Sequence, residues 1–254
     1  MKRSARVSAI MGLINSLASA ATAGAAEIKL IGATPVTAVV RELGAQFERD
    51  AGHKLIAKFV SGPIVKREID GGEPFDVAVS ITPVIDALIK EGKIVASTRA
   101  NFAYAPVAVG VRKGAAKPDI GSVEAFKRAL LNAKSVAHSA AGASGDHFKS
   151  MLQRLGIAEE MKPKLRPMPA DRIAQAVPSG DAEMIVVTSS VIIMGGAELV
   201  GPIPAELQFY NRFAAGLSTN ARQVEAAQGL LTLLTSPSVA PVIRAKGMEP
   251  GAPR

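Results

Sequence analysis

Four turns in this chain place hydroxyl side chains and small residues at the start of an expected helix. They contain Thr34, Ser61-Gly62, Ser144-Gly145 and Thr188-Ser189. Hydroxyl groups and the first backbone N–H groups of a helix donate hydrogen bonds to an anion without supplying a formal counter-charge. A single turn of this kind is ordinary in an α/β protein and often serves only to cap a helix. Four of them along one chain predict a cleft that binds a small anion.

Other kinds of site have less support from the residue types. The chain has no cysteine, which excludes disulfides, thiolate metal ligands and cysteine nucleophiles. Its three histidines, His53, His138 and His147, are not paired at metal-ligand spacing, so we expect no metal site. Ser144, Asp146 and His147 are close in sequence, but the fold, not adjacency, brings a catalytic triad together, so we expect no catalytic residues there. The patterns GxxxxGK[ST] and GxGxxG do not occur, and we expect no cofactor.

Composition and charge are typical of a globular protein. Of 254 residues, 48% are hydrophobic and 20% are charged, while aromatic residues make up only 4% and tryptophan is absent. Such a chain is large enough for one big domain or two smaller ones. The net charge of +8 comes from dispersed lysines and arginines. Without a basic stripe or stacking aromatics, we expect no nucleic-acid partner.

The first 26 residues predict an export signal. Lys2, Arg3 and Arg6 are followed by a mildly apolar stretch at 7–17 and by a run of small residues up to Ala26. The apolar part is shorter than the roughly 20 residues that a membrane-spanning helix needs. We therefore predict cleavage before Glu27 and a periplasmic mature protein. Removal of the three basic residues would leave a net charge of +5, which suits an anionic solute.

Three strand-to-helix units are predicted in the first part of the mature chain. Residues 28–47 give an apolar strand and then an amphipathic helix, with Thr34 placed as its N-cap and Pro35 at its first position. The same order recurs at 53–70 and at 76–89, again with Ser or Thr near the end of the strand. Alternation of this kind predicts a mostly parallel sheet, whose ligands bind beyond the carboxyl ends of the strands.

The second part of the chain repeats this alternation less regularly. Apolar runs and caps predict strands at 105–111, 135–138, 183–188 and 208–218, and helices at 122–132, 146–155, 171–177, 221–234 and 237–247. Residues 159–169 contain three prolines and predict turns, and the tail at 249–254 is expected to be disordered. The strands near 105–111 and 209–217 are predicted to cross between two α/β halves.

Four segments carry a resemblance to a known family. They read IGATPVTAVVREL, FVSGPIVKREIDGGEPFDVAVS, ASGDHFKSMLQRLG and DRIAQAVPSGDAEMIVVTSS. In order and spacing, over nearly all of 27–250, the chain resembles the periplasmic molybdate-binding proteins of ABC transporters. The resemblance implies an α/β type II periplasmic-binding-protein fold, with two lobes of mainly parallel sheet flanked by helices and joined by two hinge crossings. It divides the chain into a signal peptide at 1–26, lobe 1 at 27–105 plus 217–254, and lobe 2 at 106–216.

The resemblance also implies which positions contact the ligand. Transferred onto this sequence, the family's oxyanion contacts fall on Thr34, on Gly62 with Ser61 just before it, on Ser144, near Ala170 and near Thr188. Two of these positions depart from the family pattern, because Gly62 stands in place of a serine and Thr188 in place of a tyrosine.

The resulting expectation is a monomeric, extracytoplasmic binding protein that delivers a small oxyanion to an ABC-transporter permease in the inner membrane. Molybdate or tungstate, another tetrahedral oxyanion and a small carboxylate all remain open as ligands. One alternative is a periplasmic lyase or dehydratase on the same fold, for which Asp76, Asp171 and His147 are the candidate acids or bases. Another is an accessory or sensor protein that has lost the site.

Overall fold

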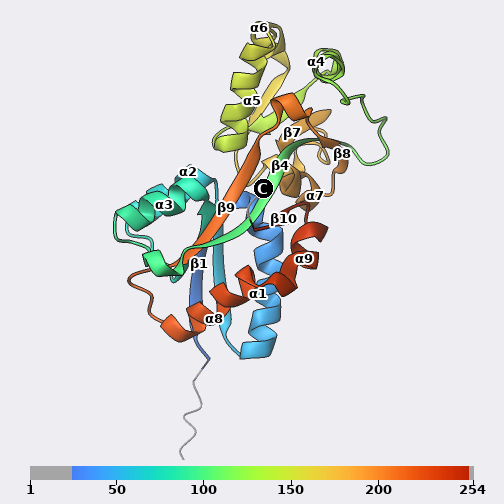
Figure 1. Ribbon diagram of the computed structural model, residues 1–254. Coiled ribbons are helices and arrows are strands. Elements are labelled where there is room, and N and C mark those ends of the chain that lie inside the picture. Colours follow the sequence, from blue (N-terminus) through green and yellow to red (C-terminus); the bar gives the residue numbers. More distant parts are fainter. Residues whose placement is uncertain (1–24, 252–254) are drawn as a thin grey trace, which may run out of the picture.

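The computed structural model of the chain describes residues 25–251, so the predicted export signal lies outside these residues except for its last two positions. The elements gather into two groups, one formed by residues 27–90 together with 224–250 and the other by residues 123–202 (Figure 1). Two long strands, β4 (Ala100–Val111) and β9 (Tyr210–Leu217), run from one group to the other (Figure 1). This is the mixed α/β fold with two crossings that the sequence predicts.

The first group is built from the three predicted strand-to-helix units. Its elements are β1 (Glu27–Ala33), α1 (Thr37–Ala51), β2 (Lys54–Val60), α2 (Gly62–Asp70), β3 (Val77–Ile81) and α3 (Thr82–Lys90). Strand β1 is parallel to both β2 and β3. The end of the chain returns to this group as α8 (Val224–Thr235), α9 (Ala240–Ala245) and the short strand β10 (Glu249–Pro250).

The second group follows the first crossing. Its elements are α4 (Val123–Asn132), β5 (Val136–Ser139), α5 (Ala143–Arg154), α6 (Ala158–Met161), β6 (Leu165–Met168), β7 (Met184–Thr188), α7 (Ser189–Met194) and β8 (Glu198–Pro202). Strand β5 is parallel to β6 and to β7. The carboxyl ends of these strands therefore meet at one edge, as they do in the first group.

The two crossings join both groups into one hydrogen-bonded sheet. Strand β4 (Ala100–Val111) pairs antiparallel with β9 (Tyr210–Leu217) over its first half and with β7 and β8 over its second half. Strand β9 in turn pairs antiparallel with β3. The strand order is β2-β1-β3-β9-β4-β7-β5-β6, with β8 and β10 paired to β4 beside this path.

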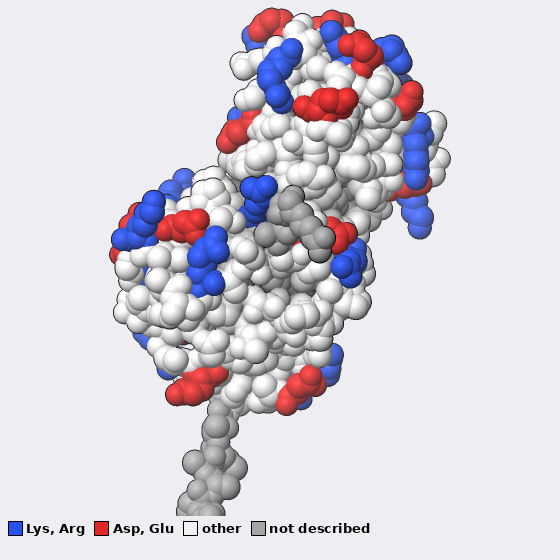
Figure 2. All heavy atoms as spheres, in the orientation of Figure 1, with Lys and Arg blue, Asp and Glu red and all other residues white. Residues whose placement is uncertain are grey.

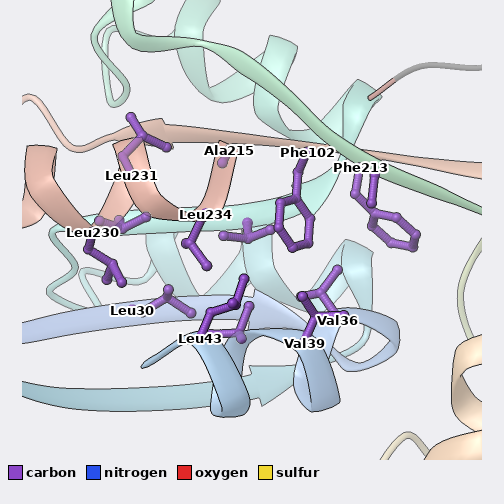
Figure 3. Packing of buried hydrophobic residues seen from close by; sticks show 14 of the residues in the cluster. Leu30, Val36, Val39, Leu43, Phe102, Phe213, Ala215, Leu230, Leu231 and Leu234 are labelled. Atoms are coloured by element: carbon purple, nitrogen blue, oxygen red, sulfur yellow. The ribbon is translucent and has the colours of Figure 1, made fainter. Parts of the chain in front are cut away.

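Each group buries its own apolar residues. Figure 3 shows the largest cluster, in which Val39 and Leu43 of α1 lie against Leu30 of β1, and Leu230 and Leu234 of α8 pack on the same face. In the second group, Phe126, Phe148 and Met151 form a separate fully buried cluster with strands β4, β5 and β7. Burial of a side chain of this size contributes about 1.5–3 kcal/mol, so the helices are held mainly by these faces.

Several local expectations are wrong in detail. Thr34 does not cap a helix through its side chain, because it is itself the first residue of a 3-10 turn (Thr34–Val36) that precedes α1. The turn region at 159–169 contains the strand β6, and the strand β8 was not predicted. The tail at 249–254 is not all irregular, since Glu249 pairs with Tyr104 of β4. In each case a partner distant in sequence decides the conformation.

Charged residues of both signs are mixed over the face shown in Figure 2, without a continuous basic stripe on that face. Many of them pair locally. Lys58 of β2 donates hydrogen bonds to Glu68 of α2 and to Glu73. These hydrogen bonds raise the pKa of Lys58. Within residues 25–251 no single helix is long and apolar enough to cross a membrane; α8 and the segment 237–245 meet that test only together, across a bend of 54°.

Candidate anion-binding site

The register of the parallel strands brings the predicted turns together. In the first group Ala33 of β1 lies opposite Val60 of β2, so Thr34 and Ser61 emerge side by side. In the second group His138 of β5 lies opposite Val186 of β7, so Ser139 and Thr188 leave the sheet close to each other. Because the crossings set the two strand-end edges against one another, both groups contribute to one site.

A cavity of about 40 Å³ occupies this junction, and all six residues predicted to contact a ligand line it. They are Thr34, Ser61, Gly62, Ser144, Ala170 and Thr188. The remaining wall is made of small and apolar side chains, including Ile81, Ile173 and Val191, together with Asn211. Among the residues that the structure describes, no charged side chain lines this cavity. The site therefore relies on hydrogen-bond donors rather than on ion pairs.

Two helices begin at the cavity wall. Helix α2 begins at Gly62 and helix α5 begins at Ala143, and neither has a side-chain hydrogen bond at its N-cap. In the first turn of α2 only Gly62 offers an N–H, because Pro63 has none and the N–H of Ile64 donates to the carbonyl oxygen of Ser61 at 2.9 Å. Other helices, such as α1 and α8, also lack a side-chain cap, so it is their position at the cavity that distinguishes α2 and α5. The N–H groups of a helix's first turn lack intrahelical partners, and the helix dipole makes them favourable contacts for negative charge.

Ser61 has a buried hydroxyl at the cavity wall whose hydrogen-bonding capacity is unused in the part of the chain that the structure describes. Ser61 is 9% exposed and lines the cavity, yet its Oγ has no hydrogen-bond partner among the described residues. A buried hydroxyl left without a partner costs about 1–3 kcal/mol. An anion in the cavity would remove this cost by accepting a hydrogen bond from the Ser61 hydroxyl.

Glycine at position 145 allows α5 to start as early as it does. A Cβ atom there would lie 2.1 Å from the carbonyl oxygen of Ser139, which no side chain tolerates. Helix α5 begins at Ala143, whereas the sequence pattern predicts a start at Asp146. This earlier start places Ser144 in the first helical turn, at the cavity wall.

Sequence reasoning missed Asn211. This residue lies on the crossing strand β9, is 4% exposed, and donates a hydrogen bond from Nδ2 to Oγ1 of Thr188 at 2.7 Å. Both side chains line the cavity. The signal that could have identified it is an amide in a strand whose later residues are almost all small or apolar.

The residues considered as acids or bases do not lie at the cavity. Asp76 is buried elsewhere, and its carboxylate accepts from the backbone N–H groups of Lys29 and Arg222 at 2.8 Å each. His147 bonds through Nε2 to the carbonyl oxygen of Leu207, and Asp171 is exposed. Across residues 25–251 there is also no cluster of three acidic or histidine side chains that could hold a metal ion.

His138 lies one residue before the cavity wall. It is 4% exposed and packs on Phe148, with ring centroids 5.4 Å apart. Burial lowers the pKa of His138, although a hydrogen bond between Nδ1 and the carbonyl oxygen of Ser139 acts in the opposite direction. The ring is therefore neutral at physiological pH and contributes no charge to an anion.

Strand ends facing one another across two crossings, with an uncharged and donor-lined cavity between them, define a solute-binding protein with the type II periplasmic-binding fold. The chain belongs to the bacterial extracellular solute-binding protein family, whose model matches residues 28–249.

Two curated relatives and one solved structure illustrate the range of this similarity. The chain is 32% identical to the molybdate-binding protein ModA of Azotobacter vinelandii over 241 residues, covering 90% of this chain and 92% of the relative. It is 29% identical to an aconitate isomerase of a Pseudomonas species over 243 residues, covering 89% and 92%. The structure of an Azotobacter vinelandii periplasmic molybdate-binding protein superimposes with a TM-score of 0.75 at 19% identity, covering 89% of this chain and all of the other.

Proposed function

We propose that the protein binds a small oxyanion of the molybdate or tungstate type in this cavity and delivers it to an ABC-transporter permease in the inner membrane. The buried Oγ of Ser61, which has no partner and lines an otherwise uncharged cavity, is the observation that carries the proposal. A hydrogen bond to a charged group contributes about 1.5–3 kcal/mol. Thr34, Ser61, Ser144, the N–H of Gly62 and the first turn of α5 are the donors that this proposal assigns to the anion.

The same donors would serve a small carboxylate, which is the second ligand class of this proposal. Ile81, Ile173 and Val191 give the cavity apolar walls that a bare inorganic anion does not need. Because the chain is similar to an aconitate isomerase, the test also includes carboxylates and measures whether the protein converts them. A binding role is favoured over catalysis because no titratable side chain of the described residues lines the cavity. A periplasmic lyase, dehydratase or isomerase would need such a group beside its substrate.

In this proposal the mature protein is a periplasmic monomer, and its lobes comprise 27–105 plus 217–254 and 106–216. Strands β4 and β9 would act as the hinge on which the lobes close around the ligand. Closure would bring the donors of the first group, such as Ser61, and those of the second, such as Ser144, onto the same anion.

The test is a thermal-shift screen of residues 27–254 with molybdate, tungstate, sulfate, phosphate, malonate and trans-aconitate, followed by calorimetric titration. A ligand at 100 times its dissociation constant should stabilise the fold by about 2.7 kcal/mol. A shift with molybdate or tungstate supports the first ligand class, and a shift with carboxylates alone supports the second. A flat screen overturns the binding role, and conversion of trans-aconitate by the purified protein overturns the assignment as a binder without activity.

A further inference from the structure

The amide of Asn211 determines what the Thr188 hydroxyl can do. Nδ2 of Asn211 donates to Oγ1 of Thr188 at 2.7 Å, and both side chains are almost fully buried at the cavity wall. A threonine hydroxyl has one proton to donate and two lone pairs that accept. Because Asn211 occupies a lone pair of this oxygen, the hydroxyl proton must point elsewhere.

The Thr188 hydroxyl can donate a hydrogen bond into the cavity. Thr188 lines the cavity, and within residues 25–251 the amide of Asn211 is the hydrogen-bond partner of its hydroxyl. An oxygen atom of an anion offers only acceptor lone pairs, so it requires a hydroxyl that donates. The Asn211–Thr188 pair therefore matches an ionised oxygen better than an isolated threonine, whose hydroxyl could rotate to other partners.

We propose that Asn211 is a positioning residue that holds the Thr188 hydroxyl as a donor toward the bound anion. This inference rests on the proposed function and assigns a role to the crossing strand β9, from which neither the resemblance nor the spacing of motifs predicts a contact. It also accounts for a polar side chain at 211 among the apolar residues of β9, such as Phe213 and Ala215. The threonine at 188 is shorter than the tyrosine of the family pattern. In this proposal the hydrogen bond from Asn211 orients the Thr188 hydroxyl toward the anion.

The proposal is tested by a double-mutant cycle on anion affinity, with molybdate and malonate as probes. Asn211→Leu removes the amide at similar size, and Thr188→Val removes the hydroxyl at similar size. We expect each to weaken binding of whichever probe the wild type binds by about tenfold or more, the order expected for one hydrogen bond to an anion. In the Thr188→Val background, Asn211→Leu should then change affinity by less than twofold.

The conservative variant Thr188→Ser keeps the hydroxyl and should retain affinity within about threefold. Asn211→Ala provides a second variant if leucine disturbs folding, which circular dichroism would reveal. A merely structural role for Asn211 predicts additive losses in the double mutant, and that result would overturn the proposal. If both Asn211 variants bind as tightly as the wild type, the proposal is also wrong while the proposed function stands. If the wild type binds no anion in the wider screen, both fall together.

Discussion

Ile81 occupies the space that a side chain at Gly62 would need. A Cβ atom built on Gly62 would lie 3.1 Å from Cγ1 and 3.2 Å from Cδ1 of Ile81, closer than most carbon atoms approach. Both residues line the cavity. A serine at position 62, as in the family pattern that the chain resembles, would therefore need Ile81 to shift by a few tenths of an ångström.

Restoring that serine should require a smaller residue at position 81. We expect Gly62→Ser alone to lower the free energy of unfolding by about 1–3 kcal/mol, because the added atoms overpack the site. The double variant Gly62→Ser with Ile81→Ala has room for the hydroxyl and should bind molybdate about tenfold more tightly than Ile81→Ala alone. Calorimetric titration and urea unfolding measure the two effects; equal affinity in the two variants would show that a donor at 62 does not reach the anion.

Replacing Ser61 should separate stability from binding. In the unliganded protein, Ser61→Ala removes a buried hydroxyl that has no partner, so the free energy of unfolding should stay unchanged or rise by about 1 kcal/mol. Anion affinity should fall by about tenfold or more because a donor to the ligand is lost.

Ser80 supplies the matched control for that experiment. Its Oγ is also buried without a partner among the described residues, but Ser80 does not line the cavity. Ser80→Ala should therefore have the same effect on unfolding and none on affinity. A loss of affinity in both variants would mean that the effect of Ser61 is indirect.

His138 predicts how stability depends on pH. Burial lowers the pKa of His138 below its ordinary value of 6.5, so the unfolded chain takes up a proton at a pH where the folded protein does not. Stability should accordingly fall as the pH drops below about 6.5 and level off once the folded protein is protonated as well. Urea unfolding between pH 7.5 and pH 5 measures this slope, and His138→Gln should reduce it; an identical slope in the variant would assign the effect to other groups.

Asp76 should prove structural rather than catalytic. Its carboxylate accepts from the N–H groups of Lys29 and Arg222, which ties β1, β3 and the segment before α8 together. Asp76→Ala would leave both N–H groups without their acceptor and should lower the free energy of unfolding by about 2–4 kcal/mol. The folded fraction should bind the anion as the wild type does. Loss of binding at full folding would instead point to a role in the site.

Much of the fold could be predicted because its signals are local. Apolar periodicity and prolines at helix starts define the three strand-to-helix units from β1 to α3. The same patterns place the strand ends of both groups, and the carboxyl ends of parallel strands necessarily share an edge. That geometry is why Thr34 and Thr188, far apart in sequence, line one cavity.

The missed features depend on partners that are distant in sequence. Asn211 reaches the cavity only because β9 pairs with β4, and β10 forms only where Glu249 meets Tyr104. Ile81 and Gly62 lie against each other in the cavity wall, although they belong to different elements. No local pattern encodes such pairings, so periodicity and capping cannot reveal them.

The position of β9 between β3 and β4 affects the order in which the two groups can fold. Val77 of β3 pairs with Leu217 of β9. This edge of β3 therefore stays unpaired until a strand near the end of the chain has been synthesised. The segment between the crossings, by contrast, is contiguous and has its own apolar cluster. We expect the second group, which contains α4 to β8, to become protected first in pulse-labelled hydrogen exchange. The first group, which is built from residues 27–90 and 224–250, should become protected last.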